Sequence, residues 1–281
     1  MPSDPLSTGR LAVDGDSPAG AIEASGSRVA RSIQNASRLE AMLRWMAYLA
    51  VTAWHFLLVP AALRVLFKAP WAALWRHVRA WSELGSRAFG VEVGFYNPAD
   101  VPLDRQYIVV ANHRSWLDQL VVAQVLSRPL HFLAKRGYFE MPVFGKAIEF
   151  VAEAIPVDEQ QMSPATEQRL ASYLEQGDSV VFYVEGTRGS GKTLLPFHSG
   201  AFRWAARCGV PILPLYVFGT EQVMSKHRSL LSLRPGRVEV VADHPVEVSA
   251  DGLAATFENF ERSYRERHDL MYDRFEAAGR F

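Results

Sequence analysis

A histidine and an aspartate five residues apart carry the clearest chemical signal in the sequence. His113 and Asp118 lie within residues 107–118, with Asn112 and Arg114 beside the histidine. An imidazole can accept a proton near neutral pH, and a neighbouring carboxylate can orient the ring and stabilise the charge that it gains. The pair is therefore a candidate for acid–base catalysis. A second interpretation stays open here: Asp118 serves only a helix N-terminus, and His113 is an ordinary loop residue.

The residues around this pair predict how it is positioned. Residues 107–111 are uncharged and are β-favouring or small, which predicts a buried strand. Ser115, followed three residues later by Asp118, resembles a capping box with aspartate in place of glutamate. This spacing predicts a helix over residues 115–127 with Ser115 as its N-cap. His113 is then expected in the short loop between the strand and the helix.

A second polar cluster follows another predicted strand, residues 178–184. It consists of Glu185, Gly186, Thr187 and Arg188. Glycine allows a positive φ or a close approach to a ligand, and the arginine fork suits a phosphate or a carboxylate. The alternative is a tight turn with a surface Glu185–Arg188 ion pair, which would contribute little to stability.

The chain from Val91 onward alternates strand patterns with helix patterns. The remaining strands are expected at residues 91–96, 130–134, 154–157, 210–217 and 237–242. The remaining helices are expected at residues 164–176 and 200–208, with a short helix that ends near residue 150 and a charged helix that begins at residue 256. This alternation predicts an α/β fold, with a mixed, largely parallel sheet flanked by helices. Ligands bind beyond the carboxyl ends of such strands, where both polar clusters are expected.

The N-terminal third differs in composition and predicts three parts in the chain. Residues 1–35 are rich in Ser, Gly, Ala, Asp and Pro, which predicts a disordered tail. Residues 36–88 are expected to form a helical membrane-associated segment, and residues 89–281 the α/β domain.

The membrane prediction depends on two stretches within residues 36–88. The nineteen residues 45–63 carry no formal charge, which is about the length that spans a bilayer. In residues 71–85, Trp71 and Trp75 recur at helical spacing beside basic residues, a pattern typical of a membrane interface. We favour a monotopic helical hairpin; the alternative is a pair of helices packed on the core.

Charge and cysteine content exclude some classes of protein. The 281 residues include 30 basic and 30 acidic side chains, a balance that argues against a general nucleic-acid binder. The single cysteine, Cys208, excludes an intrachain disulfide and fits a reducing compartment. The sequence contains no Cys/His cluster with zinc spacing.

Residues 186–193 match the G-x-x-x-x-G-K-[ST] phosphate-loop pattern. They define an alternative function, a nucleotide-binding enzyme that uses Lys192. Two features argue against it. Pro196 lies too close for a long helix to begin at Lys192, and the strand that ends near Phe218 lacks an aspartate to help hold magnesium.

Taken together, the motifs resemble the glycerolipid acyltransferase family, the lysophosphatidic acid acyltransferases. Asn112-His113-x-x-x-x-Asp118 and Glu185-Gly-Thr-Arg188 resemble its first and third blocks. Lys135 with Pro142 and Gly145 is similar to the second block, and Val210-Pro-Ile-Leu-Pro214 to the fourth. The four blocks occur in family order over residues 107–217.

The resemblance implies an O-acyltransferase with acyl-CoA or acyl carrier protein as donor, and no cofactor or metal ion. The acceptor would be a lysolipid hydroxyl, above all that of 1-acyl-sn-glycerol-3-phosphate, giving phosphatidic acid. The enzyme would act among membrane lipids, at the cytoplasmic face of the cell membrane, without nucleic acid.

The resemblance also implies a role for each candidate residue. His113 would act as general base, with Asp118 orienting the imidazole. Arg188 and Lys135 would bind the acceptor's phosphate. Gly186 and Thr187 would shape that pocket, and Glu185 would have a binding or structural role.

Two positions depart from the family pattern. Tyr183-Val184 replaces the usual Phe-Pro before Glu185, and we expect the strand to tolerate this change. Asp158 and Glu159 lie where an arginine is often found, and a carboxylate beside the acceptor's phosphate would repel it. A lysolipid with an amine-containing head group, such as a lyso-ornithine lipid, is therefore an alternative acceptor.

Overall fold

The computed structural model describes residues 36–141, 145, 148–149, 152–158 and 162–280. Its described strands form one seven-stranded sheet in the order β1-β7-β6-β2-β5-β3-β4. In chain order they are β1 (Val91–Tyr96), β2 (Ile108–Ala111), β3 (Leu130–Lys135), β4 (Ile155–Val157), β5 (Ser179–Tyr183), β6 (Ile212–Phe218) and β7 (Gly236–Ala242). All seven lie within two residues of the predicted bounds.

The sheet is mixed and largely parallel, which confirms the predicted fold class. β2, the central strand, pairs in parallel with β5 and with β6. The pairs β3–β5, β3–β4 and β1–β7 are also parallel, and only β6–β7 is antiparallel among the described pairs. Every residue of β2 and β6 is buried, as expected for strands covered on both faces.

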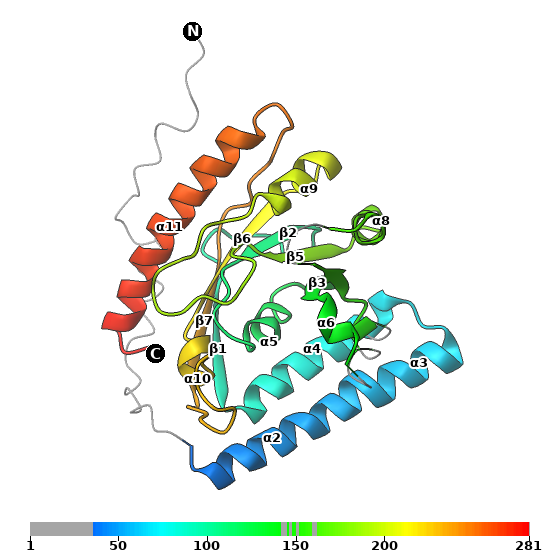
Figure 1. Cartoon of the computed structure of the whole chain (residues 1–281), viewed down its shortest axis with the longest axis vertical. Helices are drawn as coiled ribbons and strands as arrows, with labels where there is room; N and C mark the ends of the chain where they lie inside the picture. Colours follow the sequence, from blue (N-terminus) through cyan, green and yellow to red (C-terminus); the bar gives the residue numbers. More distant parts are fainter. Residues whose placement is uncertain (1–35, 142–144, 146–147, 150–151, 159–161, 281) are drawn as a thin grey trace.

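Helices cover both faces of the sheet (Figure 1). On one face lie α8 (Pro164–Glu175), α9 (Gly200–Cys208) and α11 (Leu253–Ala277). On the other lie α4 (Trp71–Ala88) and α5 (Asp118–Val122). Each face has its own cluster of buried apolar side chains. Two short helices, α6 (Arg136–Phe139) and α10 (Thr220–Val223), follow β3 and β6.

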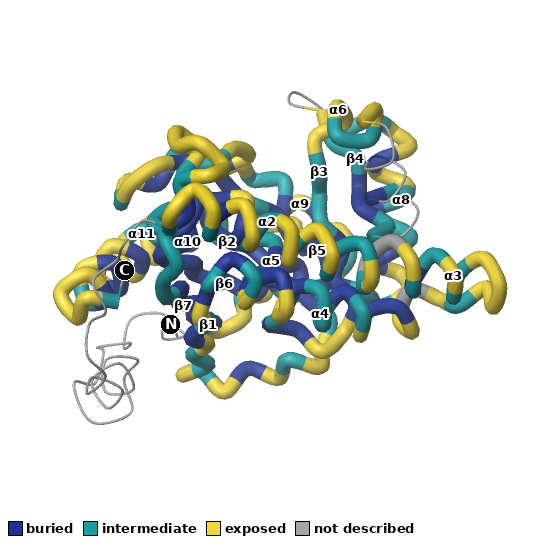
Figure 2. Tube along the Cα trace, turned by 90° about the horizontal axis from the view of Figure 1, so that it is seen from below, coloured by how far each residue is buried: buried dark blue, intermediate teal, exposed yellow. Residues whose placement is uncertain are grey.

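The first described helix is long and mostly exposed. α2 (Arg38–Thr52), η1 (Ala53–Leu58) and α3 (Val59–Phe67) form one continuous run of 30 residues, along which α4 packs. Among the described residues it is the one helix long and apolar enough to cross a membrane, with 6% of its most apolar window buried. One side packs on α4 and Phe89 through Trp45 and Tyr48. Figure 2 shows how much of this run faces outward.

The helical spacing of apolar residues in 71–85 serves the core of the protein rather than the membrane interface that we predicted. Trp75 and Val78 of α4 are buried in the core, together with Leu74. The Trp75 indole N–H donates to the carbonyl of Leu126. The prediction that this tryptophan marks a membrane interface is wrong, because the same helical spacing serves packing on α5 and the sheet. The exposed apolar surface belongs instead to the preceding helix.

The helix after His113 is shorter than predicted. α5 begins at Asp118 rather than at Ser115, and ends at Val122 rather than near residue 127. Ser115 nevertheless makes capping-type bonds: its hydroxyl accepts from the Leu117 N–H, and its own N–H donates to the Asp118 carboxylate. The Ser115 hydroxyl also donates to the carbonyl of Met224, which ties this turn to the segment after α10. Our predictions for residues 1–35, Pro142 and Glu159 lie outside the described residues.

Candidate active site

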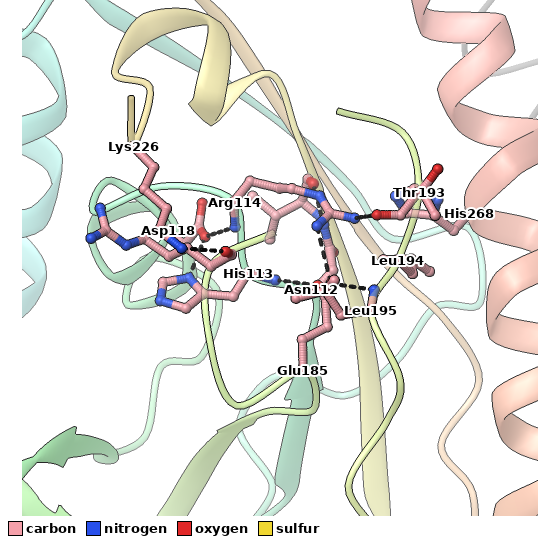
Figure 3. A network of polar contacts seen from close by, with 12 residues as sticks. Asn112, His113, Arg114, Asp118, Glu185, Thr193, Leu194, Leu195, Lys226 and His268 are labelled. Atoms are coloured by element: carbon pink, nitrogen blue, oxygen red, sulfur yellow. Dashed lines mark hydrogen bonds and ion pairs between the residues drawn. The ribbon is translucent and has the colours of Figure 1, made fainter. Parts of the chain in front are cut away.

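The two polar clusters leave the sheet side by side. Ala111, the last residue of β2, is in register with Tyr183, the last residue of β5. Asn112 extends the pairing of β2 with β6, because its side-chain amide donates to the Val217 carbonyl and accepts from the Val217 N–H, both at 2.8 Å. The expectation that both clusters lie at the carboxyl ends of neighbouring strands is confirmed (Figure 3).

Asp118 is fully buried and is surrounded by hydrogen-bond donors. One oxygen, Oδ2, lies 2.6 Å from His113 Nδ1 and accepts from the backbone N–H groups of Arg114 (2.6 Å) and Ser115 (2.9 Å). The other oxygen accepts from the Thr220 hydroxyl at 2.5 Å. A buried carboxylate costs several kcal/mol unless it is hydrogen-bonded, and these four donors meet that requirement.

This arrangement selects one tautomer of His113. An ionised carboxylate can only accept hydrogen bonds, so Nδ1 must carry the proton. The lone pair then lies on Nε2, and His113 lines a cavity of about 1670 Å³. The geometry suits a general base whose positive charge would be stabilised by Asp118.

A buried ion pair connects the two loops. Arg114 Nη1 donates to Glu185 Oε2 at 3.1 Å, and both side chains are almost fully buried. Glu185 also accepts from the backbone N–H groups of His113 (3.0 Å) and Leu195 (2.8 Å). Because these donors occupy both oxygens, the predicted substrate-binding Glu185 is placed to hold the loops together. Gly189 is needed here, since a Cβ would lie 1.8 Å from Arg114 Nη1.

The side chain of Tyr183 stacks on the imidazole of His113. Their ring centroids are 4.1 Å apart and their planes are 16° from parallel. The tyrosine hydroxyl is buried and has no hydrogen-bond partner among the described residues. Burial raises the pKa of Tyr183 well above 10, so the phenol stays neutral at physiological pH.

One cavity of about 1670 Å³ brings most predicted site residues together with His113. Lys135, Gly186, Thr187 and Arg188 all line it. Gly186 has the positive φ, 63°, that its residue type permits. The volume exceeds the usual 300–1,000 Å³ or so of a site for one drug-sized ligand, and leaves room for two substrates.

Sequence reasoning missed several residues of this site. Thr220 follows β6 and directly contacts Asp118. Lys226 lines the cavity, and its ammonium donates to the Arg188 carbonyl. Thr220 could have been found, because it is a polar residue after Gly219 at the end of the strand beside β2. Lys226 could not have been found in this way, because it lies in a loop whose sequence matches no motif.

The structure contradicts the phosphate-loop interpretation of residues 186–193. No helix begins at Lys192; the chain continues through Pro196 and His198 before α9 starts at Gly200. The Lys192 ammonium lies 2.6 Å from the carboxylate of Asp273 on α11. A phosphate loop needs a helix N-terminus at the lysine, so this pattern is a chance match.

The acidic residue that departs from the family pattern has a cationic partner. Asp158 accepts three hydrogen bonds, at 2.8–3.1 Å, from the guanidinium of Arg136. Hydrogen bonding to Arg136 lowers the pKa of the Asp158 carboxyl. The negative charge of Asp158 is thus compensated locally, which weakens the argument that it repels a phosphate.

Comparison with known proteins places this geometry in a family. The family model described as Acyltransferase matches residues 92–218. The 1-acyl-sn-glycerol-3-phosphate acyltransferase of Salmonella typhimurium is 30% identical over 183 residues, covering 63% of this chain and 73% of that protein. The chloroplastic enzyme of the same name from Brassica napus is 33% identical over 147 residues, or 51% of this chain and 41% of that protein.

A solved structure is similar in fold. The crystal structure of the 1-acyl-sn-glycerophosphate acyltransferase from Thermotoga maritima matches with a TM-score of 0.62 and 20% identity, over 81% of this chain and 97% of that one. The chain belongs to the glycerolipid acyltransferase family, as its four motif blocks predicted. It is an acyltransferase.

Replacing Tyr183 separates the roles of its ring and its hydroxyl. Tyr183→Phe keeps the stack and removes a buried, unpaired hydroxyl, so it should raise the free energy of unfolding by roughly 1–2 kcal/mol and leave kcat unchanged. Tyr183→Ala removes the stack and should lower kcat about threefold to tenfold. Chemical denaturation and steady-state kinetics measure the two effects. Equal kcat values for Tyr183→Ala and the wild type would show that the stack does not position His113.

Replacing Asp118 tests the tautomer argument. Asp118→Asn removes the negative charge that stabilises the imidazolium, and should lower kcat by roughly 10²–10⁴ with little change in KM. Thr220→Val removes one of four donors and should cost only about tenfold. Circular dichroism on both variants controls for misfolding. If a folded Asp118→Asn variant keeps full activity, His113 does not depend on this carboxylate.

Proposed function

We propose that this acyltransferase moves a fatty acyl group from a thioester donor to the free hydroxyl of 1-acyl-sn-glycerol-3-phosphate, giving phosphatidic acid. The observation that carries the proposal is the His113–Asp118 pair opening onto a cavity that is also lined by cationic side chains, Lys135, Arg188 and Lys226. An acceptor with a phosphate fits these cations. The names of the Salmonella and Brassica relatives support the same acceptor.

In the proposed reaction the acceptor itself is the nucleophile. His113 Nε2 takes the hydroxyl proton as the oxygen attacks the thioester carbonyl carbon. The tetrahedral intermediate then collapses, the C–S bond breaks, and the leaving thiolate takes the proton from the imidazolium. Asp118 stabilises the imidazolium between these two transfers. No enzyme nucleophile, metal ion or cofactor takes part in this sequence, and Cys208 has no role in it.

Positioning of the acceptor supplies a second part of the catalysis. Arg188 and Lys226 are adjacent, because the lysine ammonium donates to the arginine carbonyl. We assign the acceptor's phosphate to these two side chains and to Lys135. Fixing the phosphate beside His113 converts an encounter in the membrane into an oriented, effectively unimolecular step. Gly186 and Thr187 shape this end of the cavity.

An assay of thiol release tests the proposal. Purified protein in detergent is incubated with an acyl-coenzyme A and lysophosphatidic acid. Thiol release should require lysophosphatidic acid as well as the acyl-coenzyme A, and His113→Ala should lower its rate by roughly 10²–10⁴. Parallel reactions replace lysophosphatidic acid by a lyso-ornithine lipid, or the coenzyme by an acyl carrier protein. Transfer only to the amine-headed lipid would contradict the phosphate acceptor while preserving the chemistry.

We also place the enzyme on the cytoplasmic face of the membrane, attached through the run from α2 to α3. Leu43, Met46, Leu58, Leu66 and Phe67 are each more than half exposed along it. The exposed Lys68 at its end suits anionic lipid headgroups. A continuous exposed apolar surface of this kind marks an interaction site rather than a solvated face.

The membrane proposal predicts the effect of two polar substitutions. Leu66→Ser combined with Phe67→Ser removes two large exposed side chains, each worth about 1.5–3 kcal/mol when fully buried, and should weaken vesicle binding at least tenfold. Leu270→Ser, an exposed leucine on α11, is the control. Co-sedimentation with phospholipid vesicles measures both. Equal losses for the two variants would show that the run from α2 to α3 is not the attachment site.

A further inference from the structure

The cavity extends through the sheet from one face to the other. β3 lies between β5 and β4 in the sheet, but its pairing with β5 covers only residues 130–132, and its other edge pairs with β4 over residues 133–135. β5 continues beyond this point, since Phe182 and Tyr183 pair with β2. Residues on both sides of the resulting opening line the cavity, among them Leu133, Phe182 and Tyr183. In Figure 2, β3, β4 and α6 project from the rest of the molecule.

The two ends of the cavity differ in chemistry. The end that we call the apolar arm lies beside α2, α4 and α5, and is lined by Trp45, Tyr48, Leu49, Trp81, Leu117 and Leu120. The end that we call the α9 arm lies on the opposite face, and is lined by Met162, Glu167, Ala201, Arg203, Trp204 and Arg207. His113, stacked on Tyr183, lies at the opening between them.

The α9 arm presents two guanidinium groups one helical turn apart. Arg203 is exposed, and its guanidinium has no ion-pair or hydrogen-bond partner among the described residues. The Arg207 guanidinium lies over the ring of buried Trp204, 4.8 Å from its centroid. Its one ion pair, with Glu167 of α8, is long (3.9 Å) and exposed, so it contributes little. Both arginines can therefore bind an anion that enters this arm.

We propose that the α9 arm binds the phosphate-bearing end of a coenzyme A thioester, with Arg203 and Arg207 as phosphate ligands. This inference rests on the proposed function, and names the donor and its route. Guanidinium forks match phosphate geometry, and the coenzyme carries three phosphates near its nucleotide end. The pantetheine chain would pass through the opening and place the thioester at His113.

The position of the membrane surface supports this assignment. The lipid acceptor would arrive from the side of α2 and α3, next to the apolar arm. The α9 arm lies across the sheet from α2, α4 and α5 (Figure 1), where a water-soluble donor can enter. After C–S cleavage, the free coenzyme thiol would leave by the same route, so donor exchange would not displace the lipid.

The charges around the arm favour coenzyme A over an acidic carrier protein. A carrier protein docked on α9 at the mouth of the arm would also meet α8, whose exposed Glu167 lines the arm. Like charges across an interface oppose association. A small anion inside the arm contacts the arginines and avoids most of this repulsion.

The test combines Arg203→Ala with Arg207→Ala. With acyl-coenzyme A the KM for the donor should rise about 10- to 100-fold, since each lost charge-assisted contact contributes roughly tenfold. The kcat and the KM for lysophosphatidic acid should stay within about twofold. With an acyl-pantetheine donor, which lacks the nucleotide phosphates, the variant and the wild type should be equal. The control is Arg262→Ala with Arg274→Ala, two arginines of α11 that do not line the cavity.

Each outcome decides the inference separately from the proposed function. An unchanged KM for acyl-coenzyme A in an active double variant overturns the inference alone, and so does a loss confined to acyl carrier protein donors. If the wild type transfers no acyl group, calorimetric titration with coenzyme A decides instead. If the wild type and the control bind coenzyme A and the double variant does not, the α9 arm is a coenzyme A site and only the proposed acyl transfer is refuted. Absence of binding to the wild type overturns both.

Discussion

The buried negative charge of Asp118 is the constraint on which the geometry of the candidate active site depends. Its four donors come from two segments: residues 113–115, which supply the His113 side chain and two backbone N–H groups, and Thr220 after β6, which supplies its hydroxyl. Removing a charge from water is costly, so these segments must close around it together. The same closure orients the imidazole and leaves Nε2 facing the cavity.

A second buried charge extends this arrangement to the other loop. The Arg114–Glu185 pair connects the residue after His113 to the start of the Glu-Gly-Thr-Arg segment, and Glu185 also holds the His113 backbone. The two sequence motifs are thus joined directly by a buried ion pair. Thr187 and Arg188 then line the cavity from a loop whose first residue, Glu185, is held by three hydrogen bonds.

The cavity reaches both faces of the sheet because the pairing of β3 with β5 ends at residue 132, whereas β5 continues to Tyr183 beside β2. A continuous ladder would leave no passage between the faces. The apolar arm adjoins the exposed helix α2–α3, and the α9 arm carries the arginines. The reaction that we propose, between a membrane lipid and a water-soluble thioester, needs surfaces of both kinds near His113.

The sequence alone determined the fold class, the strands and the identity of His113, Asp118 and the 185–188 segment, because strand patterns and loop motifs depend on residues close in the chain. It misassigned Trp75, since helical spacing is the same for a core face and a membrane face. The match of residues 186–193 to the phosphate-loop pattern could not by itself show whether these residues bind a nucleotide. Only the tertiary structure decided the contact of Thr220 with Asp118, the pairing of Asp158 with Arg136 and the opening between β3 and β5. These depend on contacts between segments far apart in the chain, which no local pattern records.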